Sequence, residues 1–222
     1  MRPWEILCRE LARIRQEDPR AILMAPGIDH LADQRPPVKV HVEAWAEPIA
    51  QRLHEALGDY VALIVGVLRY PQAELTHPGS PRNDLVDADP AIVSVTADGQ
   101  LAVPSGRTLR TKVRLTNRGV QPLALTLQSD RTLYGVVIDP RSGQTVNGDM
   151  RWAPLTADVS AKIAPGSSVR LDVRVPTASA SPSLGYAIPP GEWQVRFRLP
   201  LTGASRYSAP LRLRVVTDAT NT

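Results

Sequence analysis

The stretch LRTKVRLTNRG, residues 109–119, alternates apolar or β-branched side chains with basic ones and ends in asparagine, arginine and glycine. This period of two predicts a strand with one buried and one solvent-facing side, closed by a turn. The same period returns after it, in the runs 123–127, 134–139, 169–175, 193–199 and 211–215. Seven or more short strands separated by glycine and proline turns predict an antiparallel β-sandwich of immunoglobulin-like type over residues 91–217.

The chain in front of the sandwich has a different period. Trp4, Leu7, Leu11 and Ile14 follow one another at spacings of three and four, which predicts an amphipathic helix that ends before Pro19. Alternating valines at 38–42 then predict a strand, apolar residues four apart at 45–57 a helix, and the continuous apolar run 60–68 a strand covered on both faces. Residues 1–70 therefore read as an α/β segment with one strand-helix-strand unit.

The predicted fold class is α+β, an N-terminal α/β segment followed by the sandwich. Residues 71–90 are rich in proline and polar side chains without periodicity, and we expect a linker there. Residues 218–222 are expected to form a flexible tail.

One cysteine, Cys8, excludes an intramolecular disulfide and a metal site built from cysteines. The first residues carry acidic side chains and no signal-peptide pattern, and the apolar run 60–68 is too short to cross a bilayer. We expect a cytoplasmic protein without membrane contact.

Charge is divided unevenly along the chain. Residues 1–90 hold 10 basic and 14 acidic side chains, 10 − 14 = −4, whereas residues 91–222 hold 16 basic and 8 acidic ones, 16 − 8 = +8. The basic residues of the sandwich fall on the predicted solvent-facing positions of its strands. The candidate binding residues are Arg110, Lys112, Arg114, Arg170, Arg174, Arg196, Arg198, Arg212 and Arg214.

Three interpretations of these basic residues stay open. Charged side chains on strands protect sheet edges from aggregation and cover apolar surface with their stems. They also form docking surfaces for acidic partners, the acidic front half of the chain included. Nucleic acid is the least favoured partner, because the strands lack interleaved aromatic residues for stacking on bases.

Three stretches, residues 108–146, 163–175 and 188–199, resemble the layout of bacterial immunoglobulin-like domains, in particular the intracellular proteinase inhibitor (BsuPI) type. The chain otherwise resembles proteins of high-GC bacteria. The resemblance implies an immunoglobulin-like fold and, as one possible activity, inhibition of an intracellular protease. The matching positions are Asn117, Tyr134, Asp139, Gly143, Gly191 and Trp193.

Residues suited to chemistry are few. Cys8, His41, Glu43 and His54 lie in the front half, but their spacing matches no nucleophile or metal-ligand pattern, and no phosphate-binding or dinucleotide-binding glycine motif is present. We therefore expect no catalytic residue, no metal and no cofactor. The leading hypothesis is a non-enzymatic protein whose sandwich binds another protein, with a protease inhibitor and an enzyme based on the α/β segment as alternatives.

Overall fold

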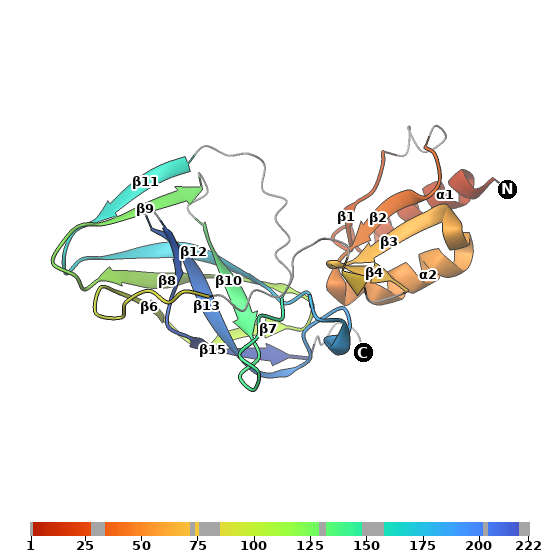
Figure 1. Cartoon of the computed structure of the whole chain (residues 1–222). Helices are drawn as coiled ribbons and strands as arrows, with labels where there is room; N and C mark the ends of the chain where they lie inside the picture. Colours follow the sequence, from red (N-terminus) through yellow and green to blue (C-terminus); the bar gives the residue numbers. More distant parts are fainter. Residues whose placement is uncertain are drawn as a thin grey trace.

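The structure, a computed structural model, describes residues 2–27, 34–71, 74–75, 85–128, 132–147, 158–201 and 204–217. It consists of a small α/β unit at the N-terminal end and a larger β unit (Figure 1). Each unit has its own cluster of buried apolar side chains. The expected tail, residues 218–222, lies outside the described residues, as does most of the expected linker.

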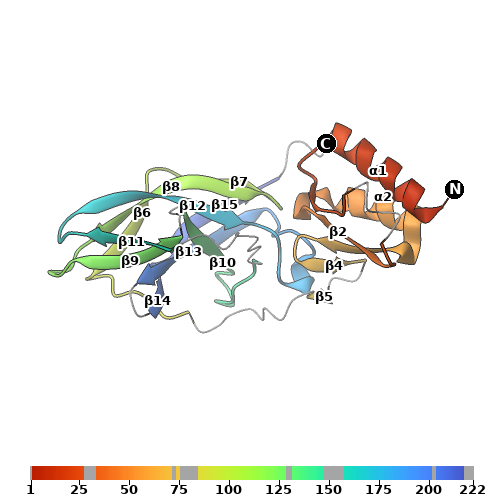
Figure 2. The same ribbon diagram turned by 90° about the horizontal axis from the view of Figure 1, so that it is seen from above.

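The α/β unit contains a five-stranded sheet with the order β1-β2-β3-β4-β5. Helix α1 (Pro3–Glu17) and helix α2 (Glu47–Leu57) pack against each other beside this sheet (Figure 2). Leu7, Leu11 and Ile14 of α1 are fully buried, as their helical spacing predicts. The strands are β1 (Ile22–Met24), β2 (Val38–Val42), β3 (Val61–Val65), β4 (Leu68–Tyr70) and β5 (Glu74–Leu75).

The predicted strand-helix-strand unit is present, since β2 and β3 are parallel and α2 connects them. The single doubly covered strand expected over residues 60–68 is wrong. The run splits into β3 and β4, which pair antiparallel around a turn at Gly66, whose φ of +60° favours glycine. In β3, Val61, Leu63 and Val65 are buried while the residues between them are half-buried. The apolar run is thus a hairpin.

The β unit contains a ten-stranded sheet within the described residues. Its layers face each other across a core in which Phe197, Leu115 and Leu133 are among the largest fully buried side chains. The strands are β6 (Val93–Ala97), β7 (Leu101–Pro104), β8 (Thr108–Asn117), β9 (Leu123–Gln128), β10 (Thr132–Ile138), β11 (Asp158–Ile163), β12 (Ser168–Pro176), β13 (Gly191–Leu201), β14 (Ala204–Tyr207) and β15 (Leu211–Val216).

One layer has the order β6-β8-β12, and the other contains the order β13-β15-β7. Strand β10 joins them, because its first half pairs with β12 and its second half, from Gly135, pairs with β13. A Cβ atom on Gly135 would lie 2.7 Å from Cγ2 of Val175 and 2.8 Å from Cγ2 of Val195. Glycine at this position lets the strand pass close between the layers, which brings this side of the sandwich near to barrel closure.

The β-sandwich is therefore immunoglobulin-like in its two-layer packing, but the expectation of a purely antiparallel sheet is wrong. β10 and β12 are parallel, and so are β7 and β15. An alternating sequence reports that one face of a strand is buried and the other solvated. It does not report the direction of the neighbouring strand.

The two units contact each other directly. Tyr186, in the loop before β13, belongs to the buried cluster of the α/β unit, and its hydroxyl donates a 3.4 Å hydrogen bond to the carbonyl of Arg69. The rings of Tyr70 and Tyr186 lie 5.8 Å apart. The backbone of Gly66 also approaches the sandwich closely, since a Cβ atom at this position would lie 3.1 Å from Cβ of Ala178. The sandwich thus supplies part of the core of the smaller unit.

Sheet pairing extends into both ends of the segment 71–90, where we expect a linker. Strand β5 pairs with β4 in the first sheet. At the other end, Asp87 forms a β-bridge with Tyr207, and Ala88 is buried in the sandwich core. Among the described residues, neither helix has the length and the apolar surface needed to span a bilayer.

Candidate functional site

The residue pairing of β8 and β12 brings five of the nine candidate residues together. Arg114 lies directly opposite Arg170, Lys112 opposite Asp172, and Arg110 opposite Arg174. Opposed residues of paired strands project from the same side of a sheet. Val113, Leu115, Leu171 and Val173, which alternate with them, are buried in the core, so the charged set faces outward. We call this set, Arg110, Lys112, Arg114, Arg170 and Arg174, the basic face.

Two carboxylates lie within the basic face. Asp98, in the turn after β6, lies 3.8 Å from Nη2 of Arg114 and 3.0 Å from Nη2 of Arg170. Asp172 lies 3.4 Å from Nζ of Lys112. These side chains are all about half exposed, and solvent-exposed ion pairs of this kind are weak. The described residues of the face carry a net charge of 5 − 2 = +3.

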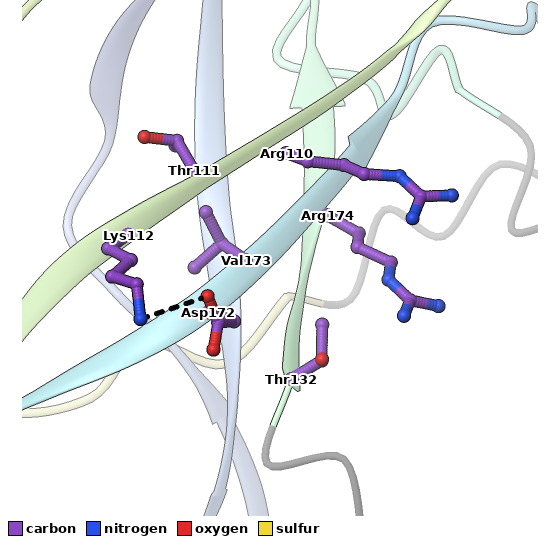
Figure 3. A pocket seen from close by; sticks show the side chains of 7 residues that line it. All are labelled: Arg110, Thr111, Lys112, Thr132, Asp172, Val173 and Arg174. Carbon is purple, nitrogen blue, oxygen red and sulfur yellow. Dashed lines mark ion pairs between the residues drawn. The ribbon is translucent and has the colours of Figure 1, made fainter.

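A shallow pocket of about 410 Å³ lies at one end of the basic face. Arg110, Lys112, Asp172 and Arg174 line it, together with Thr132 of β10. Figure 3 shows the guanidinium groups of Arg110 and Arg174 extending next to each other in the same direction, away from the pair formed by Lys112 and Asp172. The pocket thus presents two arginine side chains on one side and a neutral ion pair on the other.

The pocket end of the face adjoins the α/β unit. Arg107, just before β8, lies over the ring of Trp45. Glu43, two residues before Trp45, is influenced by the charges of Arg107 and Arg110. Burial raises the pKa of the Glu43 carboxyl, and the two arginines act in the opposite direction by favouring its ionised form. A carboxylate of the acidic front half therefore lies near Arg110.

The other four candidate residues lie on the second layer, away from the basic face. Arg196 and Arg198 belong to β13, and Arg212 and Arg214 belong to β15. Arg196 forms an ion pair with Asp87, and Arg212 forms one of 2.6 Å with Glu192. Nε and Nη2 of Arg198 donate hydrogen bonds to Oγ of Ser205. These contacts connect local strands and segments, so the nine residues do not form one surface.

Sequence reasoning missed Asp98, Thr132 and Tyr134 as members of this site. Thr132 and Tyr134 of β10 are paired in register with Asp172 and Arg174. Only the parallel pairing of β10 with β12 places them there, and no local sequence signal reports it. Asp98 lies in a turn, where an acidic residue is ordinary.

The residues considered for chemistry have separate contacts. Cys8 is half-buried against the core of the α/β unit, and His54 packs edge-on against the ring of Tyr70 at 5.8 Å. His41 is buried in β2, while Glu43 faces the arginines of the sandwich. Within the described part of the chain, no group of three or more histidine, cysteine or acidic residues could hold a metal ion.

The positions that carry the resemblance to intracellular proteinase inhibitors have structural contacts. Nδ2 of Asn117 donates to the carbonyls of Gln121 and Ile163, and its Oδ1 accepts from the backbone N–H of Gly119. Asp139 accepts from the N–H of Arg141, and Nε1 of Trp193 donates to the carbonyl of Pro189. These residues fix turns of the sandwich.

No family model and no curated protein sequence matches this chain. Among solved structures, the chain is similar to the ASH / PapD-like domain of human CEP192 (PapD-like domain 7), with 13% sequence identity and a TM-score of 0.24. The match covers 65% of this chain and 95% of that chain. The immunoglobulin-like β-sandwich rests on the strand pairing of this protein itself.

Proposed function

We propose that this protein is a non-enzymatic, cytoplasmic binding protein, and that the basic face of its β-sandwich binds an acidic segment of another protein. The observation that carries the proposal is the register of β8 and β12, which gathers five basic side chains on one outward face around two carboxylates. A surface of one sign attracts partners of the opposite sign and orients their approach.

The position of the basic face favours docking over edge protection. Arg114 and Arg174 lie at strand positions paired on both sides, since β8 pairs with β12 and, over 113–117, with β6, and β12 pairs with β8 and, over 172–174, with β10. Charged residues that prevent aggregation are needed on edge strands, whose backbone groups are unpaired. Arg114 and Arg174, whose backbones are paired on both sides, do not perform that task.

The composition of the face favours protein over nucleic acid. Tyr134 is the one aromatic residue that the described strand register places beside it, and Tyr134 is half-buried. Binding of single-stranded nucleic acid uses several aromatic rings on which successive bases stack. Carboxylates of an acidic protein segment need only the guanidinium and ammonium groups that the face supplies.

The proposal is tested with the full chain and two matched double variants. Arg114→Glu/Arg170→Glu reverses two charges of the basic face, and Arg141→Glu/Arg214→Glu reverses two exposed charges elsewhere. The wild-type protein and both variants are immobilised, and the proteins that they retain from a host-cell lysate at low salt are identified. Each retained protein is then purified and titrated against the wild type and the two variants.

A purified partner with an acidic segment, bound by the wild type and the control variant but not by the basic-face variant, supports the proposal. Binding should also weaken as salt rises, because salt screens exposed charges. Retention that is unchanged by reversal of the face, or that disappears on nuclease treatment, overturns it.

A further inference from the structure

The basic face is organised into three rows that run across β8 and β12. The first row contains Arg110 and Arg174, the second Lys112 and Asp172, and the third Arg114 and Arg170. Along β8 the rows follow one another at every second residue, which corresponds to about 6.5 Å per row in an extended strand.

The rows differ in charge. The first row carries two arginines, with Tyr134 as their register neighbour on β10 and the carboxyl of Glu43 near Arg110. The second row is an ion pair, 1 − 1 = 0, and the third contains two arginines that share Asp98, 2 − 1 = +1. The face therefore presents a pair of arginines at each end and, in the middle, a neutral row with an exposed carboxylate, that of Asp172.

An extended peptide that lies along these strands has the same repeat. Its residues i, i+2 and i+4 face the sheet, and residues i and i+4 are separated by about 13 Å, the distance from the first row to the third. An acidic residue at i+2 would face the Asp172 carboxylate, which repels it.

From this match we infer that the basic face recognises an extended acidic segment with carboxylates four residues apart and an uncharged residue midway between them. The inference rests on the proposed function and specifies its partner. The carboxylate at one end enters the pocket between Arg110 and Arg174, and the other contacts Arg114 and Arg170. The middle row selects by repulsion, which is how a surface rejects the wrong spacing.

The experiment uses the full chain labelled with ¹⁵N and three capped twelve-residue peptides of serine and threonine, each with two glutamates. The glutamates are four, two or three residues apart, so composition and charge are identical. Dissociation constants come from amide shifts at low ionic strength. We expect the four-residue spacing to bind about threefold more tightly than the two-residue spacing, which is roughly the value of one solvent-exposed ion pair. The three-residue spacing should bind weakly, because its side chains point to opposite sides.

Two single variants separate the rows. Asp172→Asn removes the repelling carboxylate of the middle row and should raise affinity for the two-residue spacing to that of the four-residue spacing. Asp98→Asn removes the carboxylate of the third row and should strengthen binding of the four-residue spacing while keeping the preference.

The outcomes distinguish this inference from the proposed function. Equal affinity for all three peptides, or a preference that Asp172→Asn leaves unchanged, overturns the spacing rule. If binding is then still lost when the charges of Arg114 and Arg170 are reversed, the proposed function stands. Failure of all three peptides to bind overturns both.

Discussion

The guanidinium group of Arg107 lies over the indole ring of Trp45, with 3.4 Å between Cζ and the ring centroid. Trp45 belongs to the α/β unit and Arg107 to the turn that leads into β8. This cation–π contact, worth about 1 kcal/mol at a partly exposed site, holds the pocket end of the basic face next to the smaller unit. The position of that face therefore depends on the contact between units.

Gly106→Ala tests this contact. A Cβ atom on Gly106 would lie 2.7 Å from the backbone N of Trp45, and φ at this position is +75°. The backbone strain costs about 1–2 kcal/mol, and displacement of the Trp45 backbone adds about 1–3 kcal/mol. Urea unfolding measures the loss. Gly143→Ala is the matched control, since its φ is +71° with nothing within 4 Å, and it should lose only the smaller amount. Equal losses would contradict the close contact.

Gly135→Ala tests the passage of β10 between the layers. The added methyl group would meet the side chains of Val175 and Val195, and we expect a loss of about 1–3 kcal/mol in the free energy of unfolding. Adding Val175→Ala to the variant should recover part of it, because that substitution creates the missing space. Gly99→Ala, with nothing within 4 Å, is the control and should change stability little. A Gly135 variant as stable as this control would refute the crossing.

Asn117→Ala removes a fully buried amide that connects a turn to β11. The carbonyls of Gln121 and Ile163 and the N–H of Gly119 lose their side-chain partner. We expect the free energy of unfolding, measured by thermal or chemical unfolding, to fall by about 3 kcal/mol. Buried polar groups left unsatisfied cost about 1–3 kcal/mol each, and relaxation of the structure recovers some of this. Thr116→Ala, which removes an exposed hydrogen bond to Ser168, should cost less than 1 kcal/mol, roughly the net value of one such bond. Similar losses at both positions would count against the role of Asn117.

Two carboxyl groups should change the stability with pH in opposite directions. Burial raises the pKa of Glu43 above its ordinary value of 4.5, so its contribution is fully present below that value and is lost as pH rises through the raised pKa. The hydrogen bond from the N–H of Arg141 lowers the pKa of Asp139 below 3.8, so its contribution is present above 3.8 and lost as pH falls through the lowered pKa.

The measurement compares the wild type with Glu43→Gln and Asp139→Asn by chemical unfolding at several acidic pH values. The stability of the wild type relative to Glu43→Gln should fall as pH rises, and relative to Asp139→Asn it should rise with pH. The same slope for both pairs would be inconsistent with these opposite environments.

Much of the local structure could be predicted because it depends on periodicity. The spacing of Leu7, Leu11 and Ile14 is sufficient for α1, and alternation within 109–115 and 169–175 is sufficient for β8 and β12. The run 60–68 was predicted wrongly as one strand, because a continuous apolar run has no period that marks the turn at Gly66. The parallel pairing of β10 with β12 had no signal either, since alternation is the same for both directions.

For the candidate site, the sequence by itself determined which basic side chains lie on the face of their strand opposite the core, because a strand alternates its side chains between two faces. It did not determine which of them meet. Register is a property of two strands far apart in the chain, and it separates Arg110, Lys112, Arg114, Arg170 and Arg174 from the arginines of β13 and β15. Only the tertiary structure decided that five charges form one face, and that Asp98 and Asp172 divide it into rows of unequal charge.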